Sequence, residues 1–142
     1  MEPFAAIEAS AFARALKSSF YIYPLVNAAH IAAIGGLVAT AVLMDLRLLG
    51  ALRSVEATPF IRLMRRAALA CFCAAVFTGV ALFSVRATEY VSNPAFLAKL
   101  SLIVLAGLNL LAFRLLGGSD DRPRGMARLS AALSIAIWLG AL

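Results

Sequence analysis

The chain has a single histidine, His30, in a long apolar stretch where few other polar side chains occur. At about 100° per residue, Asn27, His30 and Asp45 fall on one face of a helix. Ionisable groups inside apolar membrane helices are rare, usually face other helices, and are candidates for function. Two interpretations of His30 stay open: a neutral imidazole that makes one hydrogen bond to a neighbouring helix, or a ligand of a cofactor.

Haem b is the cofactor that the second interpretation favours, because helical membrane bundles hold haem through axial imidazoles. One histidine supplies only one of the two axial ligands. Met44 lies about 21 Å further along the same helix, at the standard rise per residue, so it cannot bind the same iron. A second ligand would therefore come from another subunit. A copper site at His30 is the weaker hypothesis, since copper sites gather several Cys, Met or His side chains.

Asp45 opens the sequence Asp-Leu-Arg-Leu-Leu-Gly at the end of the first apolar stretch. A carboxylate near a helix C-terminus opposes the helix dipole, which predicts a cationic partner. Arg65 and Arg66, at the start of the second apolar stretch, are the candidates. An ion pair that fixes how two helices meet and a role in proton relay or gating are both open.

The other polar side chains in apolar stretches predict structure. Asn109, Ser130 and Ser134 are expected to form hydrogen bonds between helices. Cys71 and Cys73 point about 200° apart on a helix, which predicts free thiols and no shared metal. The apolar stretches contain no paired carboxylates, and the sequence shows no Ser-His-Asp set with a plausible geometry. It also lacks a phosphate-binding glycine loop and a metalloprotease motif, so we expect no enzyme.

The elements that carry these residues are long and almost uncharged. Hydrophobic residues make up 63% of the 142 residues and charged residues 14%. About 20 helical residues cross the roughly 30 Å hydrocarbon core of a bilayer. The sequence therefore predicts one all-α domain, an integral membrane four-helix bundle. The expected spans are residues 21–45, 66–85, 95–116 and 126–142, after an amphipathic outer segment at 1–20.

Charge sets the expected orientation. The net charge is +6, and arginines gather after the first and third spans, which by the positive-inside rule places those turns in the cytoplasm and both termini outside. The 13 basic residues do not form one stripe, so we expect the lipid bilayer as a partner and no nucleic acid. The N-terminal segment lacks the pattern of a signal peptide. Its residues Phe4, Ile7, Ala11 and Ala15 share a helical face, which predicts a short amphipathic helix on the outer surface, and a disordered start is the open alternative.

Small residues recur at four-residue spacing and predict close contacts between helices, because membrane helices associate by close packing. The predicted contact ridges are Ala28, Ala32, Gly36 and Thr40; Cys71, Ala75 and Gly79; and Ala132, Ala136 and Gly140.

The chain resembles a family of small bacterial inner-membrane proteins that is known only as a domain of unknown function. The resemblance covers residues 14–116, and Asp-Leu-Arg-Leu-Leu-Gly is its most specific motif. It departs at Phe113-Arg114, where the family often has a histidine. A distant likeness to copper-resistance D-type and b-type cytochrome membrane domains concerns the fold alone. The other matching residues are Tyr23-Pro24, His30, Thr78-Gly79, Leu82-Phe83, Asn93-Pro94, Phe96, Lys99 and Ala106-Gly107-Leu108-Asn109.

These observations give three functional hypotheses. The first is an accessory subunit of a bacterial inner-membrane complex, bound to a membrane or periplasmic protein or to copies of itself. The alternative is electron transfer or metal handling through haem b or copper at His30. The third is movement of a proton or small solute along Asn27, His30 and Asp45.

Overall fold

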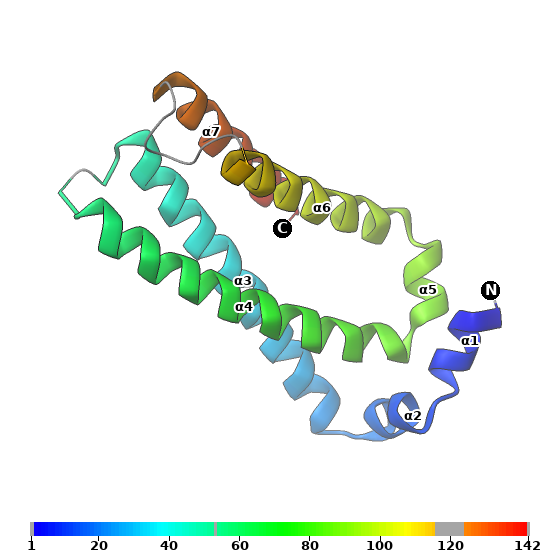
Figure 1. Ribbon diagram of the computed structural model, residues 1–142. Coiled ribbons are helices and arrows are strands. Elements are labelled where there is room, and N and C mark those ends of the chain that lie inside the picture. The colour runs from blue at the N-terminus through cyan, green and yellow to red at the C-terminus, as the bar shows by residue number, and fades with distance from the viewer. Residues whose placement is uncertain (1, 53, 116–123, 142) are drawn as a thin grey trace. The chain divides into compact units, whose positions relative to one another are not determined.

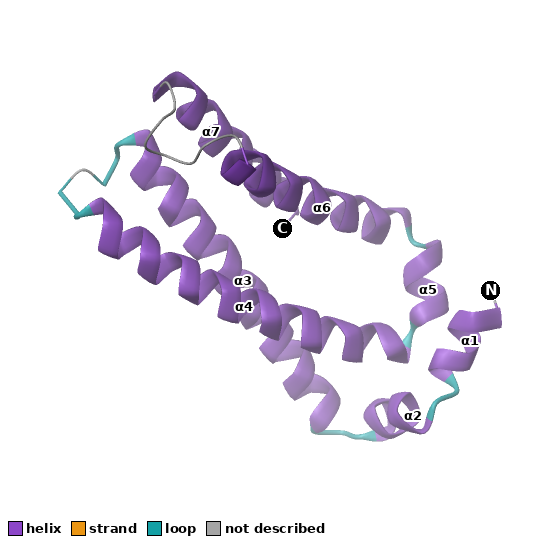
Figure 2. Cartoon of the chain, in the orientation of Figure 1, coloured by secondary structure: helices purple, strands orange, loops and turns teal. Residues whose placement is uncertain are grey.

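The computed structural model describes residues 2–52, 54–115 and 124–141, and the side chains of 2–52, 54–109 and 129–140. Every regular element in these ranges is a helix (Figures 1 and 2), which confirms the predicted all-α class. The helices are α1 (Glu2–Glu8), α2 (Ala11–Ser18), α3 (Ile22–Leu49), α4 (Ala57–Val85), α5 (Ala87–Ser92), α6 (Pro94–Leu115) and α7 (Arg124–Ala141).

Two of these helices, α3 with 28 residues and α4 with 29, are long and apolar enough to cross a membrane. Both have a proline in the first turn, Pro24 and Pro59, where the missing N–H leaves no helical hydrogen bond unmade. α3 ends beyond the expected span 21–45, and α4 begins before the expected span 66–85. Within the described side chains, apolar helical stretches also occur in α6 at Pro94–Asn109 and in α7 at Leu129–Gly140.

The conspicuous Asp-Leu-Arg-Leu-Leu-Gly sequence ends α3. Gly50 has a φ of 91°, a left-handed conformation that glycine adopts without steric cost. Its N–H donates to the carbonyl of Arg47, and the N–H of Ala51 donates to the carbonyl of Leu46. This pair of bonds is the Schellman motif, in which the residues after a helix satisfy its last carbonyls. The glycine of the motif therefore fixes where α3 stops.

The chain forms two compact units, Met1–Leu37 with Leu69–Leu97, and Val38–Ala68 with Ala98–Leu142. In the first unit, the expected single N-terminal helix is replaced by α1 and α2. The break follows from Ser10, whose hydroxyl accepts from the Ala13 N–H and caps α2. Ala13 and Leu16 form the buried face of α2, while Lys17 is exposed. The amphipathic character is as predicted. The predicted face of Phe4, Ile7, Ala11 and Ala15 is wrong, because the buried face of α2 is formed by other residues.

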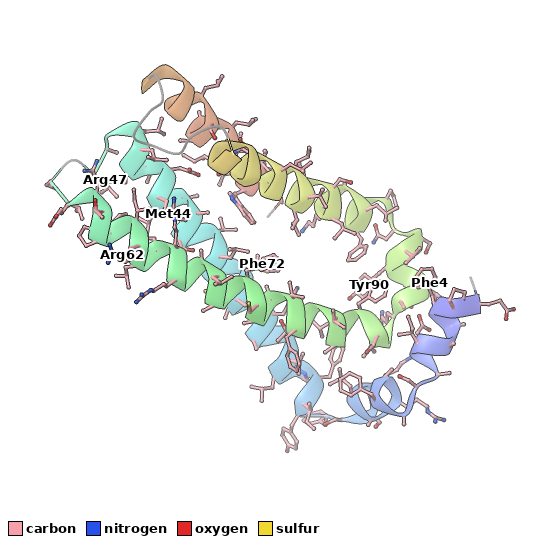
Figure 3. The ribbon with its side chains drawn as sticks, viewed as in Figure 1. Phe4, Met44, Arg47, Arg62, Phe72 and Tyr90 are labelled. Atoms are coloured by element: carbon pink, nitrogen blue, oxygen red, sulfur yellow. The ribbon has the colours of Figure 1, made fainter. Side chains whose placement is uncertain are left out.

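An aromatic cluster joins α1 to the helices around α5. Phe4 meets Phe83 edge to face at 6.3 Å between ring centroids, and Phe83 stacks with Tyr90 and Phe96. Figure 3 shows Phe4 and Tyr90 beside each other where α1 and α5 meet. Edge-to-face and offset pairs of this kind add about 0.5–1.5 kcal/mol beyond burial.

The predicted small-residue ridges are present in part. Gly36 lies against Cys71, whose sulfur is only 2.7 Å from the position a Cβ of residue 36 would take. Glycine is required there for α3 and α4 to approach each other. In contrast, Ala28 and Ala32 are exposed. On α7 the buried alanine is Ala131 and not its predicted neighbours.

Large apolar side chains cover much of the surface of the long helices. Only 17% of the apolar window in α3 and 22% of that in α4 is buried. Phe77 is 80% exposed and Leu25 is 70% exposed. A core helix of a soluble protein would be mostly buried, so these two helices do not resemble one.

Candidate functional site

His30 makes one hydrogen bond, from α3 to α4, across 2.9 Å between its Nδ1 and the hydroxyl oxygen of Thr78. The Thr78 hydroxyl itself donates to the carbonyl of Ala74, at 2.6 Å, in the preceding turn of α4. A hydroxyl has a single hydrogen, so Thr78 accepts from His30. We assign the proton of the neutral imidazole to Nδ1 on this ground, which leaves a free lone pair on Nε2.

Gly79, the next residue on α4, makes room for the ring. A Cβ at position 79 would lie 3.0 Å from Cε1 of His30. The imidazole therefore packs on the backbone of α4, and Thr78 and Gly79 together set its position. The sequence signal for this arrangement is the Thr-Gly pair in an apolar helix of a chain with one histidine. Spacing within α3 alone could not reveal it, because the partner is on another helix.

This geometry suits a ligand. Histidines that bind metals almost always donate from the other ring nitrogen to a partner that fixes the ring and its tautomer. His30 has that partner in Thr78. Within the described side chains, however, no group of three His, Cys, Asp or Glu residues could enclose a metal ion. Cys71 and Cys73 are free thiols, as predicted.

Asp45 is buried, with 8% of its surface exposed. Ser134 of α7 donates a hydrogen bond to its carboxylate, and the second carboxylate oxygen, Oδ2, is buried with no hydrogen-bond partner. The expected ion pair with Arg65 or Arg66 is not formed. Both arginines are exposed on α4, and the one ion pair among the described side chains joins Arg86 to Glu89. A hydroxyl on α7 has taken the place of the predicted cation.

The predicted hydrogen bonds of Asn109 and Ser130 are confirmed. The Asn109 amide donates to the Ser130 carbonyl at 3.3 Å, and the Ser130 hydroxyl donates to the Asn109 side-chain oxygen at 3.2 Å. Ser130 and Ser134 are four residues apart, so they share one face of α7. That face therefore contacts both Asn109 of α6 and Asp45 of α3.

Asn27 does not extend this polar set, because its side chain is exposed while those of His30 and Asp45 are half-buried and buried. The polar face predicted for α3 therefore includes His30 and Asp45 but not Asn27.

A second carboxylate was missed by the sequence analysis. Oε1 of Glu8, at the end of α1, accepts from the Thr88 N–H at 2.7 Å and from its hydroxyl at 2.5 Å. Thr88 is in the first turn of α5, so Glu8 caps a helix far away in the sequence. The hydrogen bond from the Thr88 hydroxyl, and then that from its N–H, lower the pKa of Glu8.

The start of α4 carries an open hollow of about 430 Å³. It is lined by Glu56, Thr58, Pro59, Arg62, Leu63 and Arg66. Arg62 is labelled at this end of α4 in Figure 3. Arg66, a predicted partner of Asp45, thus lines a surface hollow instead.

Comparisons with known proteins give no further assignment. No family model, no curated protein and no solved structure matches the chain. The resemblance to a family of small inner-membrane proteins stays a prediction.

Proposed function

We propose that this chain is a four-span protein of a bacterial inner membrane that serves as an accessory subunit of a membrane complex. The observation that carries the proposal is the exposure of large apolar side chains along α3 and α4. Covering such a surface with lipid or with a partner's helices removes the cost of leaving it in water.

The polar side chains within the long helices support an accessory role. His30, Asn109 and Ser130 bond to groups on neighbouring helices, and these bonds hold helices together. They do not converge on a nucleophile with a base, as a catalytic site would require. The described connections are also short, which leaves the helix surfaces as the main area for a partner.

In this proposal α6 and α7 complete the four spans, and the shorter apolar part of α7 is matched by local thinning of the bilayer. Lys99 extends its apolar stem and places its charge at the outer interface. The arginine-rich turns face the cytoplasm and both termini face outward. Tyr21, exposed just before α3, then lies at the outer interface, where tyrosine is enriched.

Topology is tested by cysteine labelling in a background with Cys71→Ala and Cys73→Ala. Tyr21→Cys should react with a membrane-impermeant maleimide in spheroplasts, and Arg62→Cys only after the membrane is opened. Labelling of position 62 from outside would reverse the orientation, and a protein that stays in solution without detergent would exclude membrane insertion.

The accessory role is tested by native electrophoresis of gently solubilised membranes. The chain should migrate with a larger complex, and the co-migrating proteins should be lost when the detergent is made harsher. A strictly monomeric species under mild conditions would contradict the proposal.

One observation favours a second candidate, haem or metal binding at His30. Thr78 orients the ring and leaves the Nε2 lone pair free to bind. Purified protein would then show a Soret band or bound copper that disappears in His30→Ala and weakens in Thr78→Val. Thr88→Val removes a hydroxyl far from the imidazole and serves as the control. A stable protein without colour or metal would exclude this candidate.

A further inference from the structure

Asp45 is the one buried charge for which the packing of the described residues gives no counterpart. Its Oδ2 atom is sealed from solvent and has no hydrogen-bond partner, and the carboxylate receives one side-chain hydrogen bond, from Ser134. Buried polar atoms in folded proteins are nearly always bonded, so each exception requires an explanation. An isolated buried carboxylate is also costly, because burial removes its hydration.

The described basic side chains near this end of α3 form no ion pair with Asp45. Arg47, two residues further on, donates from Nε to the carbonyl of Val55. Arg62, Arg65 and Arg66 of α4 are exposed. Among the described side chains, no Lys or Arg lies within ion-pair distance of Asp45. The described side chains therefore leave Oδ2 without a counter-charge, and a closed site has room only for a small cation.

We propose that Asp45 and Ser134 form a binding site for one monovalent cation, a sodium ion or a proton. One carboxylate carries one negative charge, so one monovalent cation neutralises the site. A divalent ion would leave excess positive charge in an apolar region, and no cluster of three His, Cys, Asp or Glu side chains exists among the described residues to hold it. Oδ2 is the atom that binds the cation, and the Ser134 hydroxyl donates a hydrogen bond to the other carboxylate oxygen.

The surroundings hold this site in place. Asn109 and Ser130 join α6 to α7 one turn from Ser134, so the Ser134 hydroxyl comes from a fixed helix. The Schellman motif at Gly50 ends α3 shortly after Asp45, so the carboxylate lies near a helix end whose backbone is fixed. Binding would thus couple the positions of α3 and α7 to the cation.

This inference goes beyond the accessory role and does not rest on it, because the missing counter-charge exists whether or not a partner binds. The proposal depends on membrane insertion of α3 in one respect only, which is that lipid surrounds the site. Fractionation tests membrane insertion separately, so a failure of one proposal is distinguishable from a failure of the other.

Thermal unfolding of the purified full chain in detergent tests for sodium. At fixed pH and ionic strength, replacing choline chloride with sodium chloride should raise Tm by several degrees, because a ligand that binds only the folded state stabilises it. Asp45→Asn should abolish the shift and Ser134→Ala should reduce it. Glu89→Gln, which alters an exposed carboxylate paired with Arg86, should leave the shift intact.

Infrared spectroscopy of the wild-type chain tests for a proton. If Tm is independent of sodium, a proton on Asp45 predicts a carbonyl band of a protonated carboxyl at neutral pH. This band should shift when aspartate is isotope-labelled and vanish in Asp45→Asn. The wild-type measurements are decisive even if the variants fail to fold. A Tm without sodium dependence together with fully ionised aspartates would overturn the proposal.

Discussion

His30 and Asp45 belong to one polar face of α3, yet their surroundings differ in the property that matters most for function. The His30 ring is held by Thr78 and packs on Gly79 of α4, and its unbonded nitrogen is a neutral lone pair. Asp45 is more deeply buried, and its unbonded oxygen belongs to an acidic group. Burying a neutral acceptor without a hydrogen bond costs far less free energy than burying a charge without a partner. The comparison identifies Asp45 as the group whose charge the described side chains leave unbalanced.

The strongest way to break this comparison is to remove the space for the imidazole. Gly79→Leu places a side chain where a Cβ already comes within 3.0 Å of the His30 ring, so the ring must leave its position against α4. Overpacking of this kind typically costs about 1–3 kcal/mol. We expect the free energy of unfolding, measured by denaturant titration in detergent micelles, to fall by that amount.

The matched control is Gly107→Leu on α6. A Cβ at position 107 would meet nothing within 4 Å, so the unfolding midpoint should change little. Equal losses at positions 79 and 107 would show that glycine at 79 is not needed for packing against His30.

The hydroxyls that bond to His30 and Asp45 allow a smaller change to be tested. The Thr78 hydroxyl accepts from His30, and the Ser134 hydroxyl donates to Asp45. Ser134→Ala removes a hydrogen bond to a carboxylate, and such bonds contribute about 1.5–3 kcal/mol. Thr78→Val removes a bond between neutral groups in a membrane helix, which contributes about 0.6 kcal/mol. We therefore expect the larger loss of unfolding free energy in Ser134→Ala, measured by denaturant titration in sodium-free buffer. A larger loss in Thr78→Val would mean that the Ser134 hydroxyl does not bond to an ionised carboxylate.

Sequence reasoning succeeded where a property belongs to one helix. The all-α class and the long apolar helices α3 and α4 follow from local composition and periodicity. It failed where a partner is supplied by another helix. Charge alone favoured Arg65 or Arg66 for Asp45, but which face of α4 turns outward depends on packing. Similarly, only the folded chain brings Glu8 to Thr88.

Glu8 provides a contrast to Asp45, because its carboxylate accepts two hydrogen bonds from Thr88. Its pKa is lowered from the ordinary value of 4.5, chiefly by the hydroxyl of Thr88, because the ionised form is the better acceptor. A lowered pKa in the folded state means that the contact stabilises the fold above about pH 4.5 and is lost as the pH falls through the lower folded value. The amide NMR resonance of Thr88 in micelles should report this, moving as acid releases the hydrogen bond. Glu8→Gln should remove most of that pH dependence, whereas Glu89→Gln on the same helix as Thr88 should preserve it. If the Thr88 resonance moved with pH in Glu8→Gln as it does in the wild type, another group would be the acceptor, and Glu8 could not serve as the satisfied counterpart of Asp45.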